Sequence, residues 1–391
     1  MPELPRLSRR TSWDLAANAL AERLQALRAG GRELLDLAES NPTRCGLAWP
    51  ADVLAAALAH PELGRYDPEP RGLFAVREAI AAYLASHGAP VAPGQVLLTA
   101  STSEGYGLLL KLLCDPGDEI LVPAPSYPLL DVLCQLECVR LVRYPMRYDG
   151  TWHLDMAALE EAATERTRAV VVVSPANPTG AVLSGEELSA LERFCARRGV
   201  ALIGDEVFAD TALADRAGVA STREALAFHL SGMSKVCGLP QVKVAWIAVA
   251  GPAPEVAQAM ERLEMIADGY LSVSGPSQLA TPALLAAREQ FLRPLRVRLA
   301  ANRAALARAA AVADAPFGPL RSGGGWSAVL RMGEAVDEEA LCLALLEDGV
   351  VAHPGFFYDF ERRGHLVLSL LPEPHAFREG LERIARRLLY L

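Results

Sequence analysis

Long hydrophobic stretches are missing from this sequence: no apolar run approaches the roughly 18 residues that a membrane span needs. Clusters of basic residues are missing too, and 38 Lys and Arg against 47 Asp and Glu give a formal net charge of −9. An acidic chain repels polyanions, so it favours neither nucleic acid nor an anionic membrane. We therefore expect no nucleic-acid partner and no membrane partner.

Cysteine is also scarce, with seven residues at scattered positions and no C-x2-C pair. An odd number without paired spacing supports neither a disulfide scaffold nor a zinc ribbon. The seven histidines form no cluster with metal-ligand spacing, so we expect no metal. Cys134 and Cys138 lie four residues apart in a helical pattern, which predicts that both face a core. With no apolar leader sequence and no paired cysteines, we expect a cytoplasmic protein.

Several common catalytic patterns are absent. The sequence has no G-x-x-x-x-G-K phosphate loop and no H-E-x-x-H zinc helix, and Gly232 replaces the serine of a Ser-x-x-Lys hydrolase before Lys235. The run Gly323–Gly325 lacks the preceding strand and the acidic partner of a dinucleotide site. His353 could sit near a pocket, although a structural or solvent-facing role is favoured.

The length of the chain indicates two domains, because 391 residues exceed the about 250–300 at which a single core stops growing. Between residues 90 and 250, short apolar runs alternate with helical patterns, which predicts a mostly parallel sheet covered on both faces. Thr11–Arg28 reads as an amphipathic helix, and Glu289–Ala311 as a long helix that could bridge two domains. We expect a large α/β domain over residues 48–288 and a smaller α+β domain formed by residues 1–47 and 289–391.

Polar residues follow three successive strand-like runs of the predicted sheet. Asn177, Asp205 and Lys235 each come after an apolar run and stand beside Gly, Ser or Pro. One such residue alone is usually solvated, but ligands of open sheets bind beyond the carboxyl ends of strands, where these three converge. An amine, a carboxylate and an amide suit pyridoxal phosphate, whose aldehyde condenses with lysine and whose ring nitrogen needs a carboxylate.

The same cofactor needs a site for its phosphate. The segment Thr99–Gly105 passes from a strand into a helix through Ser101, Thr102 and Ser103. A helix N-terminus rich in small hydroxyl residues receives phosphate well. Taken alone, the segment would also fit an ordinary N-cap.

In order and spacing, these residues resemble the fold-type I pyridoxal-phosphate enzymes of the class I/II aminotransferase family, over nearly the whole chain. The segments that carry the resemblance are residues 66–73 (YDPEPRGL), 123–128 (PAPSYP), 174–180 (SPANPTG), 204–208 (GDEVF) and 234–240 (SKVCGLP). The resemblance implies a mostly parallel sheet of the seven-stranded type and pyridoxal 5′-phosphate as the cofactor.

The resemblance also implies roles for single residues. Lys235 would form the Schiff base and move the substrate proton, Asp205 would pair with the ring nitrogen, and Asn177 would donate to the ring oxygen. Tyr127 would stack on the ring face. The phosphate would be held by Ser101, Thr102, Ser103 and Lys243, and by Tyr66 of the neighbouring subunit. That last contact implies a homodimer with shared active sites.

Three positions depart from the family pattern. Phe208 stands where the family commonly has a tyrosine that donates to the ring oxygen, and Lys243 replaces a phosphate-binding arginine. Val367 occupies the place of the arginine that grips the substrate carboxylate. Either the substrate lacks a carboxylate there, or another cation binds it. In the family, the loop that matches Asn41–Thr43 lies over the substrate, so the resemblance makes Asn41, Arg44 and Arg321 candidates for binding the substrate. Of the two arginines, Arg44 is favoured slightly as the carboxylate partner.

Aminotransfer between an amino acid or amine and a 2-oxo acid is the expected reaction. A C–S β-lyase or a decarboxylase is the alternative, since all three reactions start from the same adduct and sequence motifs do not separate them. A catalytically silent cofactor-binding sensor is less favoured, because all of the core chemical residues are present.

Overall fold

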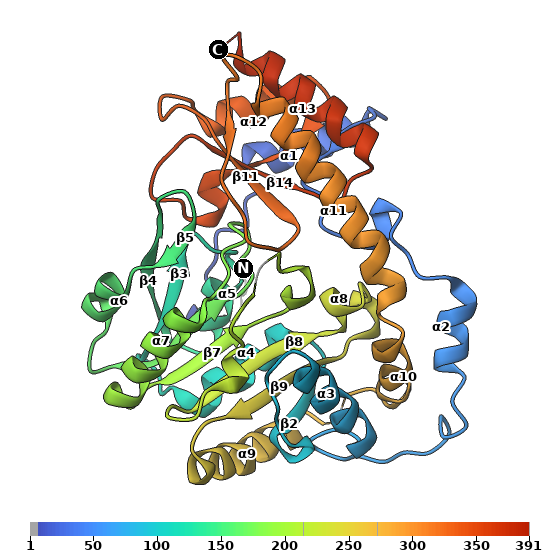
Figure 1. Cartoon of the computed structure of the whole chain (residues 1–391), viewed down its shortest axis with the longest axis vertical. Helices are drawn as coiled ribbons and strands as arrows, with labels where there is room; N and C mark the ends of the chain where they lie inside the picture. The colour runs from blue at the N-terminus through green and yellow to red at the C-terminus, as the bar shows by residue number, and fades with distance from the viewer. Residues whose placement is uncertain (1–6, 214, 272, 391) are drawn as a thin grey trace, which may run out of the picture.

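The computed structural model of the chain describes residues 7–213, 215–271 and 273–390. Its largest element is an eight-stranded mixed sheet with the strand order β2-β9-β8-β7-β6-β3-β4-β5 (Figure 1). The strands are β2 (Val96–Thr99), β3 (Glu119–Ala124), β4 (Arg140–Tyr148), β5 (Trp152–Leu154), β6 (Thr167–Val173), β7 (Ala201–Asp205), β8 (Ala227–Gly232) and β9 (Ala245–Ala250). Neighbours from β8 to β4 pair in parallel, whereas β9 and β5 pair antiparallel to their neighbours. The mostly parallel sheet is as expected, and the short β5 adds an eighth strand at its edge.

Helices cover both faces of this sheet because successive residues of its inner strands are all apolar. In β6, Ala169 and Val171 pack on one side and Val170 and Val172 on the other. The first side is covered by α4 (Thr102–Leu113), α5 (Leu129–Leu136) and α9 (Ala253–Asp268). The second side is covered by α6 (Met156–Ala162) and α7 (Gly185–Arg198), and near β2 and β9 by α3 (Phe74–Ser86) and α10 (Gly275–Ala286).

A second, antiparallel sheet has the strand order β10-β11-β14-β13, and a parallel pair joins β1 to β12. These strands are β1 (Leu35–Asp36), β10 (Gly318–Pro319), β11 (Ser327–Arg331), β12 (Val350–Val351), β13 (His353–Pro354) and β14 (His365–Ser369). The helices packed with them are α1 (Ala19–Ala29), α11 (Glu289–Ala310), α12 (Glu338–Glu347) and α13 (Pro374–Leu388). The remaining helices are α2 (Ala51–Leu58) and α8 (Met233–Val236).

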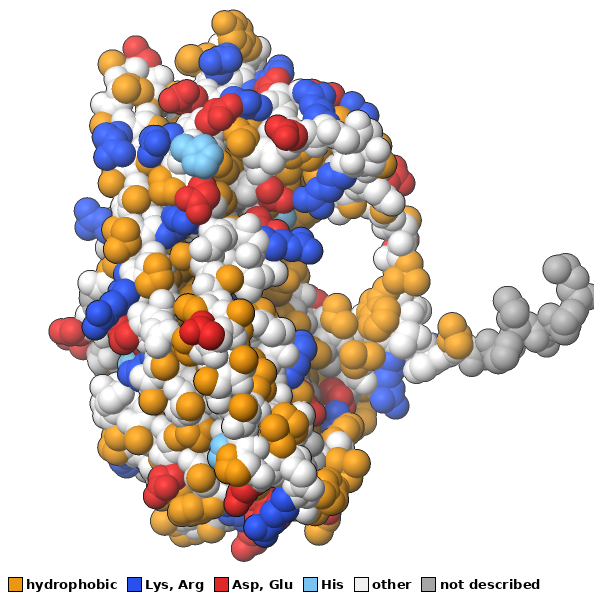
Figure 2. Space-filling view, turned by 90° about the vertical axis from the view of Figure 1, so that its right-hand side faces the viewer, with side chains coloured by type: hydrophobic (Ala, Val, Ile, Leu, Met, Phe, Trp, Pro, Cys, Tyr) orange, Lys and Arg blue, Asp and Glu red, His pale blue; other side chains and the backbone are white. Residues whose placement is uncertain are grey.

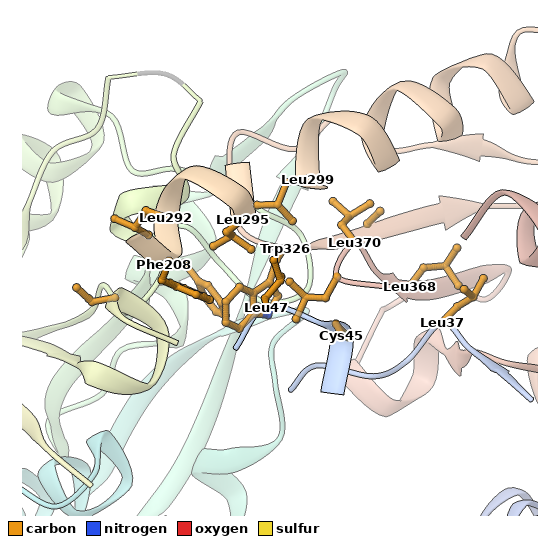
Figure 3. Packing of buried hydrophobic residues seen from close by; sticks show 14 of the residues in the cluster. Leu37, Cys45, Leu47, Phe208, Leu292, Leu295, Leu299, Trp326, Leu368 and Leu370 are labelled. Atoms are coloured by element: carbon orange, nitrogen blue, oxygen red, sulfur yellow. The ribbon is translucent and has the colours of Figure 1, made fainter. Parts of the chain in front are cut away.

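Segments from the two ends of the chain share one core. Figure 3 shows this packing for residues of the N-terminal loop, of α11, of the second sheet and of the loop after β7: Leu37, Cys45, Leu295, Leu299, Trp326, Leu368, Leu370 and Phe208. The boundaries proposed after residues 47 and 288 stay predictions, and residues 1–6 of the smaller unit lie outside the described residues. Across the described ranges, no helix is long and apolar enough to cross a bilayer.

Two local predictions were wrong. The helix predicted over Thr11–Arg28 begins only at Ala19, because the Asn18 side chain accepts a hydrogen bond from the Ala21 N–H at 2.8 Å and caps it there. Before this cap, Leu15 is 85% exposed and has no core to pack against. Cys138 is also exposed, unlike the buried Cys134, since α5 ends before it and the chain turns left-handed at φ 60°.

Gly180 joins the loop after β6 to the second sheet and leads to a prediction. Its φ is +67°, and a Cβ there would lie 2.0 Å from the Ser322 Oγ and 2.5 Å from the Gly324 carbonyl oxygen. We expect Gly180→Ala to lower the free energy of unfolding by about 1–3 kcal/mol, measured by denaturant titration. Gly185→Ala is the matched control, because its Cβ meets no atom within 4 Å. Equal stability of the two variants would contradict this account of the loop.

Candidate active site

Lys235 lies just beyond β8, at the carboxyl edge of the large sheet. Gly232 ends the strand, where a Cβ would lie 2.8 Å from the Ala245 Cβ and 3.0 Å from its Cα, so β8 and β9 approach closely. The short helix α8 then carries Lys235 to a cavity of about 300 Å³. Asn177 and Asp205 line the same cavity, so the three strand-end residues lie around one space.

The amine of Lys235 sits in apolar surroundings. Its Nζ lies 4.6 Å from the centroid of the Trp326 ring and 5.7 Å from that of Phe208. These two rings meet edge to face with centroids 4.9 Å apart. Burial lowers the pKa of Lys235 to about 8, although the charge of Asp205 opposes the shift. A useful fraction of the amine is therefore neutral and nucleophilic near neutral pH.

Asp205 is the acidic counterpart. The Tyr106 hydroxyl donates to its Oδ2 at 3.2 Å, and the Val207 N–H donates to its Oδ1 at 3.3 Å. Burial raises the pKa of Asp205 to about 6, and these two hydrogen bonds and His229 partly offset the rise. A cation placed beside this carboxylate would therefore be bound strongly.

A buried ion pair lies directly behind Asp205. Glu206 accepts from the Arg216 guanidinium at 2.5 Å and from the Val219 N–H at 2.6 Å, and its Oε2 lies 3.3 Å from the His229 Nδ1. Burial alone would raise the pKa of Glu206, but His229, Arg216 and the Val219 N–H outweigh it and bring the pKa down to about 2. The carboxylate therefore stays charged and fixes the turn that follows β7.

The N-terminus of α4 meets the cavity at Thr102. Ser101 is its N-cap and accepts from the Glu104 N–H at 3.1 Å. Ser101 and Ser103 are half-buried but do not line the cavity, whereas Ser234 does. Lys243 is exposed and adopts a left-handed φ of 57°. Unpaired N–H groups at the start of a helix, with hydroxyls beside them, make a site for an anion.

Two further predicted residues also line the cavity or contact its lining. Tyr127 is 54% exposed, and its ring centroid lies 6.4 Å from that of Tyr358. The Ser327 Oγ donates to the Asn177 Oδ1 at 3.3 Å, which leaves the amide N–H groups of Asn177 available to a ligand.

Besides Ser101, Ser103 and Lys243, four more of the predicted residues do not line the cavity. Tyr66 is 78% exposed and lines a separate surface groove. Asn41 caps the turn that follows it by accepting from the Thr43 N–H. The Arg44 side chain is 72% exposed and lies 3.4 Å from Glu39, and Arg321 is exposed as well. Neither arginine reaches the cavity lining, so neither faces the place where Val367 stands.

Residues that the sequence did not single out complete the cavity. They include Ser40 of the N-terminal loop, Tyr106 of α4, Trp326 and Ser327 at the start of β11, and Tyr358 of the turn after β13. His353 also lines it, although the sequence favoured a structural role or a solvent-facing one. The sequence does show a valine at position 367, where the family has an arginine. It does not show which residue stands opposite Val367 in the folded sheet.

The donor set fits pyridoxal phosphate. A buried amine of lowered pKa matches the aldehyde, a buried carboxylate of raised pKa matches the basic ring nitrogen, and the Asn177 amide matches the ring oxygen. The start of α4 supplies N–H groups for a phosphate. In the described part of the chain, no three His, Cys, Asp or Glu side chains form a group that could hold a metal ion.

Comparisons with known proteins agree with this chemistry. A family model described as "Aminotransferase class I and II" matches residues 32–384. The chain is similar to glutamate-pyruvate aminotransferase AlaA of Escherichia coli K12, with 27% identity over 290 residues, 72% of this chain and 71% of that protein. It is also similar to alanine aminotransferase of Mycobacterium tuberculosis H37Rv, with 29% identity over 271 residues, 68% of this chain and 63% of the relative.

Solved structures show the same fold. Alanine aminotransferase from Pyrococcus furiosus superposes with a TM-score of 0.90 at 22% identity, covering 99% of this chain and 100% of that one. Aspartate aminotransferase from Thermus thermophilus with maleate gives a TM-score of 0.83 at 26% identity, covering 98% of this chain and 100% of that one.

The raised pKa of Asp205 predicts how the cofactor-free protein responds to pH. Folded Asp205 keeps its proton up to about pH 6, whereas the unfolded side chain loses it near 3.8, so its contribution to stability is lost as pH rises through this window. We expect Asp205→Asn to stabilise the cofactor-free protein over wild type by about 2–3 kcal/mol more at pH 8 than at pH 4. Denaturant titrations at the two pH values measure this, and a difference that does not change with pH would contradict it.

Proposed function

Because the chain belongs to the aminotransferase class I and II family, whose members use pyridoxal phosphate, we propose that it moves an amino group between an amino acid and a 2-oxo acid at Lys235. The observation that carries the proposal is the cavity in which a buried amine of lowered pKa faces a buried carboxylate of raised pKa. As an aminotransferase it needs both groups, one to react and one to hold a positive charge.

When bound, pyridoxal phosphate supplies an aldehyde that condenses with primary amines and a ring that accepts the electron pair left at the substrate Cα. Lys235 is well suited to take and return the proton at that Cα, because its Nζ is shielded by Trp326 and Phe208 and its pKa is near 8. Asp205 would hold the ring nitrogen in its protonated form, and Tyr106 and Val207 fix the carboxylate in place.

The other predicted residues orient the cofactor. We assign the ring oxygen to Asn177 and one ring face to Tyr127, both of which line the cavity. The phosphate belongs at the start of α4, near Ser101, Thr102 and Ser103. Lys243 is exposed and does not line the cavity, so its part in binding the phosphate rests on the family resemblance. It would add positive charge but no paired hydrogen bonds, since an ammonium lacks the fork of a guanidinium.

We also propose a homodimer with shared active sites. Tyr66 is exposed among other exposed apolar side chains of the same region: Leu58, Leu63, Phe74, Tyr270 and Leu271. Figure 2 looks onto the side that carries α2 and α10, and hydrophobic side chains gather on the lower part of this face. A second subunit would bury them and bring Tyr66 to the partner's phosphate site.

A cytoplasmic location is part of the same proposal. All seven cysteines are free thiols, and five of them are buried in the core. Unpaired cysteines of this kind are typical of proteins that work in a reducing compartment.

Trapping of the cofactor on the chain tests the role of Lys235. The sequence has three lysines, and the other two, Lys111 and Lys243, are exposed. Borohydride reduction of the holoenzyme followed by peptide mapping is expected to place the label on Lys235.

A second experiment tests the reaction. Mixing the holoenzyme with a panel of amino acids and amines should convert it to the pyridoxamine form, and Lys235→Ala should lower that rate at least about a thousandfold.

Lys111→Met serves as the control, because Lys111 pairs with Glu137 on the surface. A label on Lys111 or Lys243 would overturn the assignment. Release of pyruvate and ammonia would indicate the β-lyase, loss of CO₂ the decarboxylase, and no reaction with any donor the silent sensor.

The shared site makes a separate prediction. Each proposed site takes Lys235 from one subunit and Tyr66 from the other, and Tyr66→Ala and Lys235→Ala each remove one of these two residues. A dimer with one subunit of each variant therefore has one site in which both residues are intact. Reassociation of equal amounts of the two inactive variants should therefore restore about one quarter of the wild-type activity per subunit. Activity that stays at the sum of the two separate variants would show that Tyr66 does not act across subunits.

A further inference from the structure

An amino acid substrate brings a carboxylate into the cavity, and a carboxylate removed from water needs a compensating partner. Among the described residues that line the cavity, the basic side chains are Lys235 and His353. The proposed function commits Lys235 to the cofactor. His353 is therefore the basic group that remains for the substrate.

The pairing of two strands brings His353 to the required place. In the antiparallel ladder of β13 and β14, His353 stands directly opposite Val367. Directly opposite residues point to the same face of a sheet, with Cβ atoms about 4.5–5.5 Å apart. Val367 itself is 3% exposed and packs with Leu320 and Val329, so it offers a carboxylate no partner.

The imidazole of His353 has one nitrogen occupied. Its Nδ1 lies 3.0 Å from the Tyr358 hydroxyl, which fixes the ring. Within the described part of the chain, Nε2 makes no hydrogen bond and belongs to a side chain that lines the cavity. This arrangement leaves one N–H available to a ligand when the ring is protonated.

The charged groups around His353 are few. Asp36 of β1 favours protonation, but burial outweighs it and lowers the pKa of His353 below its ordinary value. Burial and the neighbouring Tyr127 raise the pKa of Tyr358, so its hydroxyl stays neutral. Glu338 of α12 is occupied by the N–H groups of Phe356 and His365. The ring is thus largely neutral until an anion arrives.

We propose that His353, oriented by Tyr358, binds the carboxylate of the amino acid substrate through its Nε2–H. The proposal rests on the proposed function and names the group that replaces a guanidinium in this chain. It requires the imidazole to take up a proton when the carboxylate binds, because the incoming charge favours the imidazolium form. The affinity for carboxylates should therefore rise as pH falls.

Matched substrates test the proposal with the holoenzyme. Each reactive L-amino acid is compared with the amine that has the same side chain but no carboxylate. The rate measured is that of conversion of the holoenzyme to the pyridoxamine form. His353→Gln keeps an N–H donor but cannot carry the charge, and should lower kcat/KM for the acid about 10–100-fold, mainly through KM. The rate with the amine should not change. Tyr358→Phe should give a smaller loss of the same kind.

The control is His365→Gln, since His365 lies on β14 but does not line the cavity. A preference of the wild type for the amine, or an unchanged acid-to-amine ratio in His353→Gln, overturns the proposal and leaves the aminotransferase function intact. If the wild type instead reacted with no amino acid and no amine, the proposed aminotransferase function would itself be wrong.

A binding measurement tests the role of His353 independently of the rate of reaction. Calorimetric titration of the holoenzyme with propionate, in two buffers of different ionisation enthalpy, counts the protons taken up on binding. We expect uptake approaching one proton per site at pH 7 in wild type and in His365→Gln, and none in His353→Gln. Binding of propionate without proton uptake in the wild type would contradict the proposal.

Discussion

The site depends on one electrostatic conflict: a carboxylate and an amine are held at the edge of the sheet where water solvates neither of them fully. Burial pushes the pKa of Asp205 up to about 6 and that of Lys235 down to about 8, so each loses part of its usual charge. A ligand that brings a cation to the first group and an electrophile to the second relieves both shifts at once. The electrostatics of the cavity therefore suit the cofactor.

The surrounding fold maintains this conflict. The parallel strands β6, β7 and β8 end at the same edge of the sheet and place Asn177, Asp205 and Lys235 there. Helices on both faces of the sheet exclude water from the strands. The ion pair of Glu206 with Arg216 fixes the turn behind Asp205. Removal of Glu206 would leave the buried Arg216 without its carboxylate partner, at a cost of about 3–5 kcal/mol.

Much of this was predictable from the sequence, because apolar runs and the polar residues after them depend on local pattern. The mostly parallel sheet and the family follow from that pattern. What failed depends on partners and caps that the pattern does not show: Trp13 donates to Gln135 of α5, and the Asn18 cap starts the helix late, at Ala19. The pairing of His353 with Val367 is equally invisible, since register in a two-residue strand is set by tertiary packing.

The short parallel ladder between β1 and β12 has a consequence for biosynthesis. Leu35 pairs with Val350, so the first strand leaves the ribosome long before its partner exists. At translation rates on the order of 10 residues per second, that wait lasts roughly half a minute. During this time Leu37, which later belongs to the same core as Leu368 and Leu370, lacks that core. The cavity itself is complete only after β14 has been synthesised, because Val367, Leu368 and Ser369 of that strand form part of its lining.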